Sequence, residues 1–274
     1  MEKILVLGFL FLVVAYFVIL KPWLQTRRRA RISVLPFPEV WKQILNEHFP
    51  LYSRLPVKLK NDLEGKIQIF LDEKQFSGKK GLEITDTMRV LIAAQACMLI
   101  LNRPSHFFPK LTTILVYPST FFSMQQQREG DLIVEKNVFR SGESWVSGPL
   151  VLAWDASKRG AKNPFDGQNV VMHEFAHQLD QEDNRSDGVP DLREPSLYST
   201  WPSALGKEYH VLIEQTRKRN RTVLNKYGAT NPAEFFAVAT ETFFEKPKQL
   251  STKHRELYDI LCEFYKLDPL EWES

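Results

Sequence analysis

The stretch VVMHEFAHQLDQED, residues 170–183, carries two histidines four positions apart, His173 and His177, with Glu174 directly after the first. On a helix, a spacing of four places both imidazoles on one face, within reach of a single metal ion. The positions around them are mostly apolar, which is typical of a helix inside the fold and argues against two ordinary surface histidines. The stretch therefore predicts a buried helix that holds a metal site.

The glutamate after the first histidine indicates what such a site could do. Its carboxylate would lie beside the metal rather than on it, where it can accept a proton from a metal-bound water. Zinc lowers the pKa of such a water towards neutrality. The pattern predicts one Zn²⁺ per chain and a hydrolytic reaction with Glu174 as the general base.

A hydrolytic zinc site needs a third protein ligand and a fourth position for water. The metzincin pattern HExxHxxGxxH needs a glycine at position 180 and a histidine at position 183. The chain has Asp180 and Asp183 there, so Asp183 is a weak candidate for the third ligand. His210 and His254 lie in charged segments and are expected to be solvated.

A stronger candidate lies in NKYGATNPAEFFAVATETFFEKP, residues 225–247. Asn231 and Pro232 predict the start of a helix, with the asparagine as its cap. Glu234 and Glu241 stand seven positions apart, and so lie on nearly the same face of that apolar helix. Two such carboxylates are costly unless paired or metal-bound, so one should ligate zinc and the other hold a ligand histidine from behind. The spacing alone does not rank them.

Four stretches together resemble the Mlc titration factor A (MtfA) family of zinc metallopeptidases, which is related to the catalytic domain of anthrax lethal factor: HEFAHQLD, GPLVLAW, ILVYPSTF and YGATNPAEFFAVATETFF. The resemblance covers residues 35–270. It implies that the third zinc ligand is the glutamate of the AEFFA segment, Glu234, and that Tyr227, seven positions earlier, assists catalysis. A phenol near the metal can donate a hydrogen bond to a developing oxyanion.

In some relatives, the acid that holds a ligand histidine lies four positions after the ligand glutamate. That position is Val238 in this chain. Asp180, seven positions after His173 and on the same helix face, is the first choice, and Glu241 is the second.

The resemblance implies a metallopeptidase that hydrolyses a peptide or protein substrate. The family name comes from association with a glucose-responsive transcriptional repressor, so the alternative is a regulatory protein that sequesters such a partner, with hydrolysis secondary or absent. Glu174 favours hydrolysis, because a structural metal site does not need it. The substrate is expected to add to the strand within residues 147–154 by β-augmentation.

The amino-terminal run ILVLGFLFLVVAYFVIL, residues 4–20, contains no charged residue. As a helix it would extend roughly 26 Å, close to the hydrocarbon thickness of a membrane. A cleaved signal peptide has a basic head, whereas the strong charge here follows the apolar run. The pattern predicts a single-pass inner-membrane protein with its catalytic domain in the cytoplasm, because basic side chains lie on the cytoplasmic side.

The chain is expected to divide into a transmembrane anchor at 1–24, a basic juxtamembrane linker at 25–38 and a zincin-like metallopeptidase domain at 39–274. The fold class predicted for that domain is α+β, with helices packed on a small mixed sheet. Strands are expected at 110–118, 131–139 and 145–154. Helices are expected at 57–76, 86–102, 164–181, 201–218, 231–245 and 250–265.

Charge and cysteine content exclude other classes of protein. The net charge is +3, but residues 21–31 hold five basic side chains and no acid, which leaves 3 − 5 = −2 for the rest, since Glu2 balances Lys3. Because the rest of the chain is nearly neutral, we expect no direct nucleic-acid binding. Two cysteines are too few for a disulfide framework or a cysteine zinc cluster.

Overall fold

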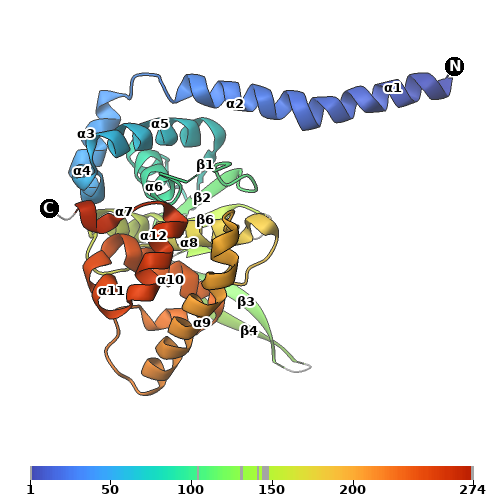
Figure 1. Ribbon diagram of the computed structural model, residues 1–274. Coiled ribbons are helices and arrows are strands. Elements are labelled where there is room, and N and C mark those ends of the chain that lie inside the picture. The colour runs from blue at the N-terminus through green and yellow to red at the C-terminus, as the bar shows by residue number, and fades with distance from the viewer. Residues whose placement is uncertain (1, 104, 130–131, 141, 144–147, 273–274) are drawn as a thin grey trace.

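The computed structural model describes residues 2–103, 105–129, 132–140, 142–143 and 148–272. The described part is mostly helical (Figure 1). The helices of the body are α3 (Glu39–His48), α4 (Pro50–Arg54), α5 (Val57–Glu73), α6 (Asp86–Met98), α7 (Trp154–Lys162), α8 (Val170–Asp180), α9 (Pro195–Arg217), α10 (Pro232–Glu245), α11 (Pro247–Lys253) and α12 (Arg255–Tyr265).

One small sheet lies among these helices. Its strand order is β1 (Gln75–Gly78), β2 (Thr113–Tyr117), β6 (Leu150–Ala153) and β5 (Gly142–Glu143). β1 and β6 both run parallel to β2, and β5 runs antiparallel to β6. Side chains alternate along β2, where Ile114 and Val116 are fully buried between half-buried neighbours. A separate hairpin of β3 (Phe121–Glu129) and β4 (Leu132–Arg140) extends from the body (Figure 1).

The apolar helices α6, α8 and α10 form the interior. Every residue of α6 from Val90 to Met98 is buried, as expected for a helix that is apolar on all sides. α8 contacts α6 on one side and α10 on another. Phe175 of α8 packs against Phe108 and Phe70, with ring centroids 4.8 and 5.7 Å away. The helix with the two histidines is thus fixed in the core.

The amino-terminal arm consists of α1 (Glu2–Ala15), a π-helical turn (Tyr16–Leu20) and α2 (Lys21–Ile32). α1 extends away from the body, whereas α2 contacts α5 (Figure 1). Among the described residues, no helix combines the length and the apolar character that crossing a membrane requires. The predictions of a transmembrane helix and of a single-pass inner-membrane location are therefore wrong. The apolar run is divided between α1 and the π-helical turn, and the helix that follows is strongly basic.

The basic residues that follow the apolar run were expected to form a juxtamembrane linker, but two arginines of α2 bind the body. Arg29 donates from Nε and Nη2 to Glu73 of α5 at 2.7 and 2.9 Å. Arg28 donates to Asp72 at 2.7 Å. The guanidinium of Arg29 also lies 4.6 Å from the ring centroid of Phe107. These contacts dock α2 along α5.

The predicted fold class also needs correction. An α+β domain behind a membrane helix was expected, whereas the described chain is predominantly helical and its sheet is a minor element. The strand β6 is only four residues long, because it ends at Ala153 and α7 begins at Trp154. The division of the chain at residues 24 and 38 stays a prediction.

Candidate metal centre

Two asparagine caps set the helices that carry the candidate site. Asn169 precedes α8, and its side chain accepts a hydrogen bond from the backbone of Met172 at 3.0 Å. Asn231 precedes α10 and accepts from the backbone N–H of Glu234 at 2.9 Å. Such caps satisfy free N–H groups and fix where each helix starts. They also place a carboxylate, Glu234, in the first turn of α10, where the helix dipole favours negative charge.

The structure brings His173, His177 and Glu234 together from these two helices. One donor atom from each residue lies within 4.8 Å of the other two. Nε2 of His173 is 2.9 Å from Glu234 Oε2, and Nε2 of His177 is 3.4 Å from the same oxygen. All three side chains are largely buried, with between 11% and 17% of each exposed. Two imidazoles and one carboxylate are the donor set of several hydrolytic zinc sites.

The charges around this cluster favour a cation. Burial lowers the pKa of His173, but the neighbouring Glu241, Glu234 and Glu174 outweigh burial and raise that pKa well above its usual value. Burial raises the pKa of Glu234, but its hydrogen bonds to both histidines outweigh burial and hold that pKa well below its usual range. The surroundings that favour a proton on the imidazole also favour a metal ion, so the residues fit a bound divalent cation.

Glu241 holds His173 from behind. Its Oε1 lies 2.7 Å from His173 Nδ1, and its Oε2 accepts a hydrogen bond from the backbone N–H of Asn169 at 2.5 Å. The two ring nitrogens of His173 thus contact different glutamates: Nδ1 contacts Glu241, and Nε2 contacts Glu234. A contact of this kind fixes the tautomer that leaves Nε2 free for a metal.

Asp180, the first choice for that contact, is placed elsewhere. It is fully buried, and its Oδ2 accepts from the backbone N–H of Gly188 at 3.1 Å. Burial raises its pKa to about 6. Asp180 therefore holds the loop that follows α8, and the structure gives the contact with His173 to Glu241.

Asn169 and Glu245 belong to the same network, although no feature of the sequence was taken to predict them. Glu245 is 2% exposed, and its two oxygens accept from Asn169 Nδ2 at 3.1 Å and from the backbone N–H of Gln168 at 3.0 Å. Burial, together with the nearby charge of Glu241, raises the pKa of Glu245 to about 9. The signal was present in TETFFE, where a second glutamate follows Glu241 by one helical turn on an apolar helix.

Two further predicted residues lie beside the cluster. The hydroxyl of Tyr227 donates to Glu234 Oε1 at 3.3 Å, and its ring centroid is 5.9 Å from that of His173. Tyr227 is 55% exposed, so it approaches the cluster from the solvent side. Glu174 is 6% exposed and follows His173 on α8.

The weaker ligand candidates are not part of the group. Asp183 lies in the 3₁₀ turn after α8 and accepts from the backbone N–H of Arg185 at 2.9 Å. His254 pairs through Nδ1 with Glu208 at 2.7 Å. His210 lies on α9 and is exposed.

The strand expected to receive a substrate is not free to do so. β6 lies between β2 and β5 in the sheet, so both of its edges are occupied. The pairing with β5 covers Val151 and Leu152. The expectation of β-augmentation on β6 is therefore wrong, because a strand in the interior of a sheet offers no free hydrogen-bonding edge.

Comparison with known proteins places this geometry in context. The model of the glucose-regulated metallo-peptidase M90 family matches residues 23–266. A protein of Synechocystis sp. described as uncharacterized is 42% identical over 268 residues, which cover 97% of each chain. The Mlc titration factor A of Escherichia coli O7:K1 is 30% identical over 259 residues, covering 91% of this chain and 92% of that one. The Shigella flexneri protein of the same name is 29% identical over the same length.

Proposed function

This chain belongs to the glucose-regulated metallo-peptidase M90 family, and we propose that it is a zinc-dependent peptidase that cleaves peptide bonds. The observation that carries the proposal is the convergence of both histidines of the HExxH segment on one carboxylate oxygen of Glu234. Glu234 lies 61 positions after His173 and 57 positions after His177 in the sequence, and the three side chains meet in a helical core. Ordinary packing does not require three such groups to converge.

His173, His177 and Glu234 would hold the zinc ion through two nitrogens and one carboxylate. When bound, zinc supplies Lewis acidity to water and to the substrate carbonyl. Glu241 accepts the Nδ1 proton of His173 and so keeps Nε2 directed at the shared site. Asn169 holds Glu241 through its backbone N–H, which links the orientation of the ligand to the start of α8.

Glu174 acts as the proton carrier of the proposed reaction. Its carboxylate takes a proton from the attacking water and delivers it to the nitrogen of the departing amine. Its burial on α8 keeps bulk water from competing for that proton. The reaction balances, because one water is consumed and its elements are divided between the new carboxylate and the new amine.

Tyr227 provides a hydrogen-bond donor for the reacting carbonyl. Its hydroxyl lies on the exposed side of the cluster, 3.3 Å from Glu234 Oε1. A substrate carbonyl entering from solvent can take this hydrogen bond in place of the glutamate. The phenol then stabilises the negative charge that develops on the carbonyl oxygen.

The names of the relatives support a second candidate function. Proteins called Mlc titration factor A match 91% of this chain, and the name indicates binding of a partner, Mlc. A regulatory protein of this kind would bind a transcriptional repressor, with hydrolysis secondary or absent. Hydrolysis remains the first proposal, because Glu174 has no role in a purely structural metal site.

The two candidates are separated by the variant Glu174→Gln, which removes the proton carrier and keeps the shape of the side chain. We expect it to bind zinc like the wild type and to lose peptide hydrolysis by a factor of about 10² to 10⁴. The matched control is Glu214→Gln, which changes an exposed glutamate of α9. If Glu174→Gln hydrolyses a fluorogenic peptide library at the wild-type rate, this mechanism is ruled out.

A further inference from the structure

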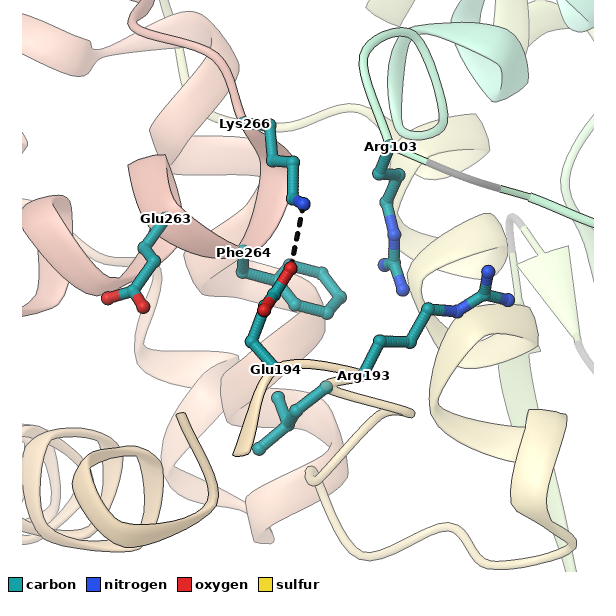
Figure 2. A pocket seen from close by; sticks show the side chains of 7 residues that line it. Arg103, Arg193, Glu194, Glu263, Phe264 and Lys266 are labelled. Atoms are coloured by element: carbon teal, nitrogen blue, oxygen red, sulfur yellow. Dashed lines mark hydrogen bonds and ion pairs between the residues drawn. The ribbon is translucent and has the colours of Figure 1, made fainter. Parts of the chain in front are cut away.

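The buried charges around Arg103 have partners within the chain. They lie between the end of α6, the segment before α9 and the end of α12 (Figure 2). Arg103 donates to the backbone carbonyl of Asp191 at 3.0 Å, and Arg193 lies 3.3 Å from the carboxylate of the same residue. Lys266 donates to Glu194 at 2.9 Å, as Figure 2 shows. This group links three segments of the fold, whereas another buried charge leads to the metal centre.

That charge is Glu245, which lies on the same face of α10 as Glu234 and Glu241. The three glutamates are spaced seven and four positions apart, and this spacing places side chains along one side of a helix. Glu234 meets both histidines, and Glu241 meets Nδ1 of His173. Glu245, the last residue of α10, is 2% exposed and meets the residue that precedes α8. Three carboxyl groups of α10 thus contact α8 and its cap.

Asn169 connects Glu245 to the metal centre through four hydrogen bonds. Its Nδ2 donates to Glu245 Oε1 at 3.1 Å, and its backbone N–H donates to Glu241 Oε2 at 2.5 Å. Its Oδ1 accepts from the backbone N–H of Met172 at 3.0 Å, and its backbone carbonyl accepts from the N–H of His173 at 2.9 Å. Asn169 therefore caps α8 and at the same time holds the acid behind His173.

Packing restricts Asn169 to this arrangement. The residue is fully buried, and a Cβ added to Gly160 of α7 would lie 3.0 Å from its Cγ. Because Oδ1 is used by the cap, the amide has one orientation, with Nδ2 directed towards Glu245. A buried N–H group that loses its acceptor is costly, so Asn169 is expected to shift when Glu245 is removed.

Glu245 and Glu241 can lie close together because Glu245 holds a proton. Burial, together with the charge of Glu241, raises the pKa of Glu245 to about 9. The side chain is therefore uncharged at neutral pH and adds no second negative charge beside Glu241. An amide has the same charge and nearly the same shape, so Glu245→Gln is expected to keep the contact with Asn169.

We propose that Glu245 is a positioning residue for the zinc site, which acts through Asn169 and Glu241 on the imidazole of His173. The inference rests on the proposed zinc site. Without the hydrogen bond from Asn169 to Glu245, the backbone N–H of Asn169 no longer fixes the carboxylate of Glu241. His173 then loses part of the restraint on its orientation, and zinc binds less tightly.

The test measures the zinc Kd of the full chain by competition with a chromophoric chelator. Glu245→Met removes both acceptors and keeps the length of the side chain. It should raise Kd by about 3- to 10-fold, less than the loss of a direct partner of the ligand. Glu245→Gln should stay within about twofold of wild type. The matched control is Glu208→Met, which changes a buried glutamate of α9 that pairs with His254, and it should keep the wild-type Kd.

Two further variants test the route from Glu245 to the ligand. Because Glu245 acts through Glu241, adding Glu245→Met to Glu241→Gln should raise Kd by less than about twofold more. Asn169→Ser keeps a capping oxygen and the backbone N–H but removes Nδ2. It should raise Kd about as much as Glu245→Met does, and it tests the same contact if Glu245→Met fails to fold.

The outcomes separate this role from the proposed function. Unchanged Kd values in Glu245→Met and Asn169→Ser, while wild type binds zinc, would overturn the positioning role alone. The same follows if Glu245→Met has its full effect in the Glu241→Gln background, or if Glu208→Met raises Kd equally. Wild type that binds no zinc would overturn the proposed zinc site and this inference with it.

Discussion

Glu234 and Glu241 show how two identical side chains on one helix acquire different roles. Seven residues along α10 correspond to about 10.5 Å, nearly two turns, so both carboxylates face α8 but at different heights. Glu234 meets His173 at Nε2 and Glu241 meets the same ring at Nδ1. The sequence predicted one ligand and one supporting acid, and the spacing alone could not assign them.

The supporting role of Glu241 predicts a loss of metal affinity without a loss of fold. Glu241→Gln removes the charge that holds the Nδ1 proton of His173, so zinc affinity should fall by about 10- to 100-fold. Competition with a chromophoric chelator measures this Kd. Asp180→Asn is the control, because Asp180 contacts the backbone of Gly188 instead of His173. Equal Kd values for Glu241→Gln and wild type would contradict the role.

Glu245 predicts a pH dependence of stability. Its pKa is about 9 in the folded state, above the ordinary 4.5, so the folded protein holds a proton that the unfolded chain releases between these values. Stability should therefore fall as pH rises through that window, by at most about 1.4 kcal/mol per pH unit. Urea unfolding between pH 5 and 8.5 measures the slope. Glu245→Gln should have a flatter slope, and an unchanged slope would refute the assignment.

At the scale of elements, the start of α10 was predicted from its cap. Asn231 was expected to cap a helix at 231–245, and α10 spans Pro232–Glu245 with Asn231 as its cap. The helix that carries His173 and His177 was expected from 164, but α8 begins at Val170. Gly167 has φ +68° and Asn169 takes the cap, so the chain turns before it becomes helical. Apolar periodicity does not report such a turn.

The cap of α10 predicts a linked effect on stability and metal binding. Asn231→Ala removes the acceptor for the backbone N–H of Glu234 and should cost about 1 kcal/mol of unfolding free energy. Zinc affinity should fall as well, because Glu234 lies in the turn that loses its cap. Asn231→Ser keeps an acceptor and is expected to retain most of both. Chemical unfolding measures the stability of both variants, and zinc titration measures their zinc affinity. A larger loss of stability or affinity in Asn231→Ser than in Asn231→Ala would contradict the role of the cap.

At the scale of the whole molecule, local patterns predicted the parts better than their arrangement. The helix 250–265 was expected to be continuous, but the chain bends at His254, which separates α11 from α12. The arginines after the apolar run were read as a membrane signal, yet Arg28 and Arg29 pair with Asp72 and Glu73, 44 residues away. Contacts between distant segments, including the one between Glu245 and Asn169, depend on the fold and have no local signature.

The candidate site was predictable because its chemistry needs particular residue types at fixed spacing. His173 and His177 lie on one helix face, Glu174 directly follows the first, and their neighbours are apolar enough to place that helix in the core. Glu234 required a second segment, and the structure brings it to both imidazoles.

The central claim is that His173, His177 and Glu234 hold one zinc ion, and metal content tests it most directly. Wild type, Glu234→Gln and Asp183→Asn are dialysed against the same low concentration of free zinc, and bound metal per chain is measured by elemental mass spectrometry. We predict one zinc per chain in wild type and in Asp183→Asn, and less than a tenth of that in Glu234→Gln. Full zinc occupancy in Glu234→Gln, or none in wild type, would contradict it.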